Sequence, residues 1–79
     1  MKKQEIKTIR YTLKRHFFVD VMEVGESVEF WLGNEGCDVR ELMFAASAQF
    51  APAERYESMI EENAEDYLED FADAYLTEE

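Results

Sequence analysis

Several residue types are scarce in this sequence, which contains one cysteine, one histidine, one proline and three glycines. The single cysteine, Cys37, excludes a disulfide within the chain and is typical of a reducing compartment. The longest apolar run, residues 42–46, is far too short for a membrane-spanning helix or the core of a signal peptide. We therefore expect a soluble cytoplasmic protein that makes no contact with a membrane.

Basic residues are also scarce, because eight lysines and arginines stand against nineteen acidic residues, which gives a formal net charge of −11. A charge of this sign disfavours direct contact with nucleic acid and favours a basic protein partner. The charge is unevenly distributed: residues 1–16 carry +5, residues 17–50 carry −6 and residues 51–79 carry −10. The acidic C-terminal segment is the first place to look for a functional surface.

The chain lacks a convergent set of catalytic residues. His16 and Cys37 are the only residues of their kinds, and no third residue is placed to orient either of them as a nucleophile or base. Zinc-ligand spacing, a glycine-rich phosphate loop and an EF-hand loop are absent. The sequence predicts a protein that is not an enzyme, with no cofactor and no metal site.

The longest periodic segment runs from Pro52 to Leu76 and predicts one amphipathic helix, with Pro52 in its first turn. Its apolar residues fall on one face about a third of the circumference wide, which we expect to lie on the core. These residues are Tyr56, Met59, Ile60, Ala64, Tyr67, Phe71, Ala74 and Tyr75.

The opposite face of this helix carries two rows of carboxylates at i, i+4 spacing. The first row is Glu57, Glu61, Glu65, Glu69 and Asp73, and the second is Glu62, Asp66 and Asp70. The six like-charged pairs destabilise the helix by roughly 0.2–0.5 kcal/mol each, or about 1–3 kcal/mol together. Stability therefore does not explain the pattern. A face that only promotes solubility and a surface that binds a basic partner both stay open as interpretations.

The charge density of this segment approaches that of a nucleic acid. Residues 54–79 have a net charge of −10 and, as a helix, would span about 39 Å. That is about one charge per 4 Å, roughly half the linear density of duplex DNA. Such a surface is able to occupy a site built for a phosphate backbone.

The first segment of the chain, residues 3–16, fits two patterns. Ile6, Ile9 and Leu13 share a helical face, whereas Ile9, Tyr11 and Leu13 also alternate with polar residues as in a strand. Early Glu5 and late basic residues suit a helix dipole, so we favour a helix, and the strand stays open. We expect this basic segment to neutralise part of the acidic helix.

Residues 17–33 predict a β-hairpin, because two alternating segments flank Gly25-Glu26, a pair suited to a type II′ turn. Pairing Val24 with Ser27 places Val21 opposite Phe30, so the apolar residues of both strands share one face. The other face carries Trp31 among acidic residues, either covered by a helix or exposed as an interface anchor.

A further helix is predicted from Val39 to Gln49, preceded by a capping box made by Asp38 and Glu41. Phe44 and Ala48 form a second apolar face on it, with core and interface both open as roles. The predicted fold is a small single α+β domain, residues 1–79, in the order α-β-β-α-α, with the hairpin packed against two C-terminal helices.

In size, charge and layout the chain resembles the small acidic inhibitors of bacteriophages, above all anti-CRISPR proteins that act as DNA mimics. The resemblance covers most of the chain, includes no diagnostic motif, and rests on the acidic residues that follow the hairpin. These are Glu57, Glu61, Glu62, Glu65, Asp66, Glu69, Asp70 and Asp73. It implies a non-catalytic inhibitor in a bacterial host cell that blocks nucleic-acid binding by a basic Cas effector. Arginines that read guanines in such an effector would donate bidentate bonds to these carboxylates.

Two hypotheses from other classes stay open. The chain could be a structural or adaptor protein whose acidic face serves solubility, with a homodimer formed through Trp31, Phe44 and Ala48. It could also be an antitoxin that wraps a basic toxin. Monomer and homodimer are equally compatible with the sequence.

Overall fold

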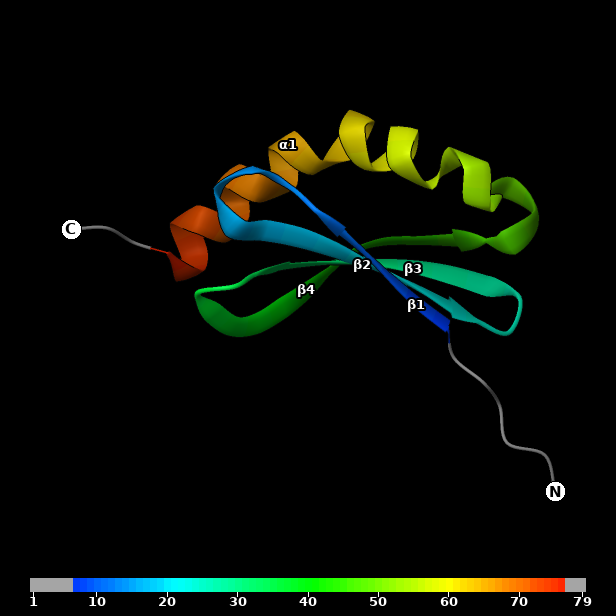
Figure 1. Ribbon diagram of the computed structural model, residues 1–79, viewed down its shortest axis with the longest axis horizontal. Coiled ribbons are helices and arrows are strands. Elements are labelled where there is room, and N and C mark those ends of the chain that lie inside the picture. The colour runs from blue at the N-terminus through cyan, green and yellow to red at the C-terminus, as the bar shows by residue number, and fades with distance from the viewer. Residues whose placement is uncertain (1–6, 77–79) are drawn as a thin grey trace, which may run out of the picture.

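The computed structural model describes residues 7–76. Among these residues four antiparallel strands form one sheet in the order β1-β2-β3-β4, and a single α-helix crosses one face of that sheet (Figure 1). The elements are β1 (Lys7–Thr12), β2 (Phe17–Val24), β3 (Ser27–Asn34), β4 (Cys37–Ser47) and α1 (Tyr56–Tyr75), with 3₁₀ turns at Lys14–His16, Ala48–Phe50 and Ala53–Arg55. The α+β class is confirmed, but the predicted order α-β-β-α-α is wrong.

The β2–β3 hairpin has the predicted register. Val24 lies opposite Ser27 and Val21 opposite Phe30, so the apolar residues of both strands point towards α1. Gly25 has a φ of 61° at the first central position of the turn, as a type II′ turn requires. Local turn chemistry and alternation were enough to place this element.

The predicted helix over residues 3–16 is wrong where the structure describes the chain. Lys7–Thr12 is the strand β1, in which Ile9 pairs with Val21 and Tyr11 with Val19. Residues 3–6 of the predicted helix lie outside the described residues. This segment forms a strand because β2 supplies hydrogen-bond partners for β1, and the core beside β2 supplies an apolar surface on which Ile9 and Tyr11 pack.

The predicted helix from Val39 to Gln49 is also wrong, because Cys37–Ser47 forms β4 and the Asp38–Glu41 capping box does not exist. Phe44 lies opposite Phe30 and Leu42 opposite Trp31, which leaves Met43 as the extra residue of a β-bulge. The extra residue interrupts the two-residue alternation of a strand. The apolar residues of β4 therefore follow a spacing that resembles a helix.

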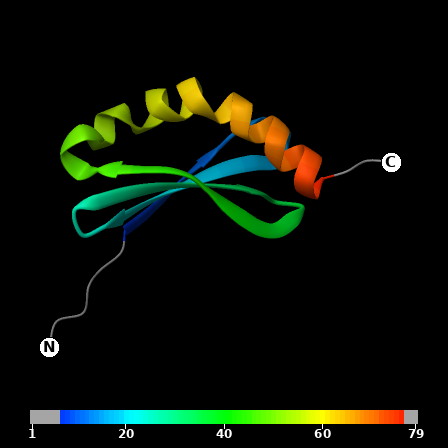
Figure 2. The ribbon, with the colours of Figure 1, turned by 180° about the vertical axis from the view of Figure 1, so that it is seen from behind.

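The core lies between α1 and the sheet face that α1 covers (Figure 2). The helix predicted from Pro52 to Leu76 is present as α1, but it begins at Tyr56 and ends at Tyr75. Only part of its predicted apolar face is buried. Leu68, which the prediction left out, is buried, whereas Tyr67 is 36% exposed. The buried residues of α1 are Tyr56, Ile60, Ala64, Leu68 and Phe71.

Two turns at one end of the sheet hold each other in place. Arg15 and His16 in the β1–β2 turn have φ values of 58° and 68°, which are uncommon for residues with side chains. The backbone N–H of Glu35 donates to the His16 carbonyl at 2.9 Å, and the buried Asn34 side chain donates to the Arg15 carbonyl at 3.2 Å. These bonds from the β3–β4 turn stabilise the unusual backbone.

The second face of the sheet is centred on Asp20, whose side chain is 1% exposed. Arg10 donates two hydrogen bonds to Asp20, at 2.7 and 2.9 Å, and Arg40 donates one at 2.9 Å. The Arg10 guanidinium also lies 3.8 Å above the Phe18 ring, which packs over Gly33. The Arg10 hydrogen bonds, supported by the one from Arg40, hold the pKa of Asp20 below its usual value.

Replacing Asp20 by asparagine should lower the free energy of unfolding at neutral pH by about 1–3 kcal/mol, the usual cost of leaving buried hydrogen-bonding groups unsatisfied. Because folding lowers the pKa of Asp20, its contribution is complete above the unfolded value of about 3.9 and is lost as the pH falls through the folded value. Urea unfolding of the parent and of Asp20→Asn at pH 7 and in acid measures the difference.

Asp38→Asn is the matched control, because Asp38 is exposed on β4. It should leave the free energy of unfolding within about 0.5 kcal/mol of the parent. A loss in Asp20→Asn that is the same in acid as at pH 7 would contradict the ionic role of Asp20.

Candidate protein-binding surface

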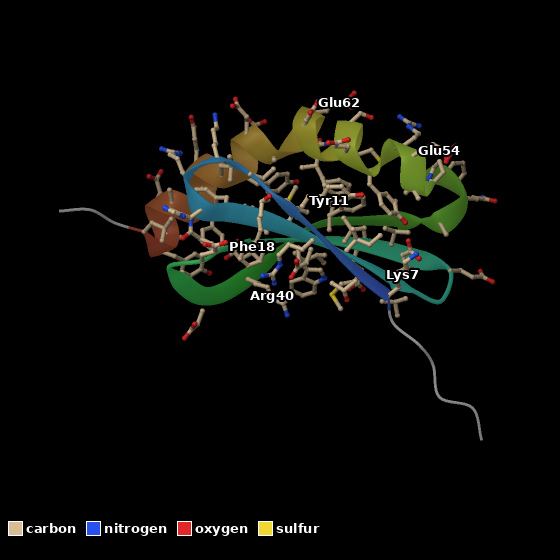
Figure 3. The ribbon with its side chains drawn as sticks, in the orientation of Figure 1. Lys7, Tyr11, Phe18, Arg40, Glu54 and Glu62 are labelled. Carbon is tan, nitrogen blue, oxygen red and sulfur yellow. The ribbon has the colours of Figure 1, made fainter. Side chains whose placement is uncertain are left out.

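The eight carboxylates predicted to bind a partner are all exposed. The apolar stripe of α1 faces the sheet, so both rows of acids face solvent, and Glu62 points away from the sheet (Figure 3). We call this set the acidic surface. Its members are Glu57, Glu61, Glu62, Glu65, Asp66, Glu69, Asp70 and Asp73.

The spacing of charge on this surface matches one strand of a nucleic acid. Glu57 and Asp73 are sixteen residues apart on one continuous helix, which is about 24 Å at 1.5 Å per residue. Eight carboxylates over that length give about one charge per 3 Å, and one strand of duplex DNA carries one per about 3.4 Å. The axial spacing between charges on this surface is thus close to the spacing between phosphates along one strand of a nucleic acid.

Little of this charge is compensated within the fold. The Lys14 ammonium lies 3.2 Å from the Glu65 carboxylate, and this exposed contact is the only ion pair of the acidic surface in residues 7–76. Arg10 and Arg40 are bound to Asp20 on the opposite face of the sheet. The expected neutralisation by the basic first segment is therefore confined to Lys14, within the part of the chain that the structure describes.

Two tyrosines anchor the ends of α1 to the sheet. Tyr56 at the first residue of the helix donates to a Glu23 carboxylate oxygen of β2 at 2.7 Å, and Tyr75 at the last residue donates to Glu41 of β4. Burial, together with the Glu23 hydrogen bond, raises the pKa of Tyr56 to about 12. The Glu41 hydrogen bond raises the pKa of Tyr75 as well. Both phenols stay protonated at neutral pH, so both anchors persist.

A groove runs between β1 and α1, beside the acidic surface, and is apolar at the end lined by Ala64 and Leu68. It consists of two adjoining hollows of about 330 and 270 Å³, which share Leu13, Ile60 and Glu61 in their walls. The sequence did not predict this β1–α1 groove, because the favoured helix over residues 3–16 includes Tyr11 and Leu13, whereas Tyr11 lies in β1 and Leu13 directly follows it. Its other lining residues are Arg10, Tyr11, Thr12, Lys14, Glu57, Ala64, Glu65 and Leu68.

Phe44, Trp31 and Ala48, through which the sequence allows a homodimer, do not share a surface. Phe44 stacks on Phe30 on the side of the sheet that α1 covers, with ring centroids 4.5 Å apart. Trp31 follows Phe30 in β3, so it lies on the opposite face, where its indole N–H donates to Glu29 at 3.0 Å. Ala48 is exposed in a 3₁₀ turn beyond β4. An interface through Phe44 and Trp31 together would need both faces of the sheet.

No other site emerges from the part of the chain that the structure describes. It has no group of three or more side chains able to hold a metal ion, and α1 is not apolar enough to cross a membrane. His16 lies near Glu35, while Cys37 packs against the core. Comparison with protein families, with curated proteins and with solved structures finds no match to this chain.

The acidic surface should reduce the stability of the fold. Replacing Glu69 by glutamine removes its repulsion with Glu65 and with Asp73, so the free energy of unfolding should rise by about 0.4–1 kcal/mol at low salt. The gain should shrink at high salt, because screening already weakens the repulsion. Urea unfolding at low and high sodium chloride measures both effects.

Glu54→Gln is the matched control. Glu54 precedes α1 and belongs to neither row of carboxylates, and its charge is favourable near the helix N-terminus. This change should give no gain in stability. Equal stabilisation by Glu54→Gln and Glu69→Gln would show that net charge, rather than the row of neighbours, sets the cost.

Proposed function

We propose that this protein is a non-catalytic inhibitor that occupies a basic surface of another protein, where that protein would otherwise bind nucleic acid. The observation that carries the proposal is the acidic surface: eight exposed carboxylates along one helix, with a single compensating ion pair in residues 7–76. Its cost to the fold, about 1–3 kcal/mol, argues that the pattern serves binding.

Charge chemistry indicates how such a partner would be recognised. Arginine and lysine side chains that hold phosphates donate equally well to carboxylates, and arginine does so with two parallel hydrogen bonds. A surface of one sign also accelerates encounter with a basic groove and keeps nucleic acid away. A Cas effector, whose basic channel reads guanines with arginines, is the partner class that we propose to test first.

Reversal of the central carboxylates tests this proposal. A variant with Glu61→Lys, Glu65→Lys and Glu69→Lys should keep the fold, because all three side chains are exposed, and should lose partner binding. The measurement is capture of CRISPR effectors from an expressing bacterial lysate by the immobilised protein, followed by displacement with duplex DNA. The parent should capture an effector that DNA displaces, and the variant should not.

The control variant carries Glu26→Lys, Glu35→Lys and Asp38→Lys, three exposed positions outside α1. It changes the net charge by the same amount, so retained capture would show that the position of the charge matters. If the helix variant still captures the effector, or if DNA fails to displace it, the acidic surface is not the inhibitory site. A basic toxin captured in place of an effector would favour the antitoxin hypothesis.

A second candidate function, self-association as a structural or adaptor protein, is favoured by the sheet face that no described element covers. Leu42 is 47% exposed on that face. Asp20 partly neutralises the positive charges of Arg10 and Arg40 on the same face. Under this hypothesis sedimentation would depend on protein concentration, and Leu42→Lys would abolish that dependence. The triple reversal on α1 would leave it unchanged, and sedimentation as a monomer at high concentration would exclude it.

A further inference from the structure

The outer edge of β1 is free among residues 7–76, because β1 is the first strand of the sheet and pairs with β2 alone. The Leu13 N–H donates to the Phe17 carbonyl at 2.7 Å, so this is a hydrogen-bonded pair at the end of the ladder. Hydrogen-bonded and non-hydrogen-bonded pairs alternate along antiparallel strands. The backbone N–H and C=O groups of Thr12, Arg10 and Thr8 therefore point outwards, where a further strand would bind them.

The β1–α1 groove lies on the helix side of this free edge. Leu13, Ala64 and Leu68 form the apolar wall of one of its hollows, and the exposed residues Glu57 and Glu61 line the adjoining, more polar hollow. Figure 3 places Tyr11 below α1, and this residue lines the same groove. Apolar surface beneath carboxylates suits long basic side chains, whose methylene stems pack on the wall while their charged ends reach the rim.

We infer that an extended segment of the basic partner adds to β1 as a fifth strand and places alternate lysine or arginine side chains in the β1–α1 groove. The inference rests on the proposed function and specifies how the partner is held. Alternate residues of a strand are about 6.6 Å apart. Glu57 and Glu61 are about 6 Å apart along α1, a similar spacing, so two basic side chains of one strand have two carboxylates within their reach.

Charge decides between this occupant and a second copy of the chain. Two copies joined edge to edge through β1 would form one continuous sheet, with the two α1 helices on the same face. The Glu57 and Glu61 carboxylates of each copy would then lie near those of the other copy across the joint, with Lys14 of each copy as the compensating charge among residues 7–76. Like charges so placed repel, whereas a basic segment neutralises them.

A synthetic peptide of alternating lysine and valine is the probe, and a peptide of the same composition with its lysines and valines in two separate blocks is the control. Amide hydrogen exchange followed by NMR is the readout. The alternating peptide should slow exchange at the Arg10 and Thr12 amides by at least about tenfold, because each would gain a hydrogen bond. The Tyr11 amide, which already faces β2, should change much less.

A matched pair of double variants distinguishes binding in the β1–α1 groove from non-specific electrostatic attraction to α1. Glu57→Gln with Glu61→Gln removes two charges from the groove rim, and Glu62→Gln with Glu69→Gln removes two from elsewhere on the same helix. The first pair should weaken peptide binding at least about tenfold, and the second less than about threefold. All four side chains are exposed, so both variants should retain the fold.

Three outcomes would overturn the inference: no binding of the alternating peptide at low salt, equal protection of Arg10 and Thr12 by the block peptide, or equal weakening by the two double variants. The proposed function would survive each of these if the triple reversal on α1 still abolished effector capture. Its own failure is distinguishable, because effector capture would then persist in that triple variant.

Discussion

Packing of one stripe of α1 against the sheet is the constraint on which the other features depend. Ile60, Leu68 and Phe71 are almost fully buried there, and burial of each such side chain contributes about 1.5–3 kcal/mol. Repulsion among the acids on the far side of the helix costs about 1–3 kcal/mol in all. Apolar burial therefore outweighs the repulsion and forces the carboxylates outwards as a rigid array.

Basic side chains near the middle of the sheet are kept away from this array by Asp20. It binds Arg10 and Arg40 on the face opposite α1, where an unpaired buried carboxylate would be costly. The molecule is consequently segregated by charge, with an acidic helical face and a nearly balanced sheet face. Lys14 alone reaches across to the helix among the residues that the structure describes.

The free edge of β1 and the β1–α1 groove make the acidic surface selective for one kind of partner. Carboxylates alone would attract any basic surface, whereas an unpaired strand edge accepts only an extended backbone. Tyr56 and Tyr75 fix the two ends of α1 on the sheet, so the rim and the edge keep a constant separation. A preorganised site of this kind loses less conformational entropy when a partner binds.

The sequence by itself determined the acidic helix, the position of its carboxylates and the register of the β2–β3 hairpin, because each depends on a local period or turn. It did not determine β1 or β4, because the hydrogen-bond partners of these strands come from other segments. In β4 the bulge at Met43 also alters the spacing of the apolar residues. The sequence did not predict the β1–α1 groove either, because the groove forms only where Leu13 and Ile60, which are distant in the chain, line the same hollow. Local patterns therefore specified the segments whose structure depends on their own period or turn, whereas pairing with other segments decided that β1 and β4 are strands and not helices.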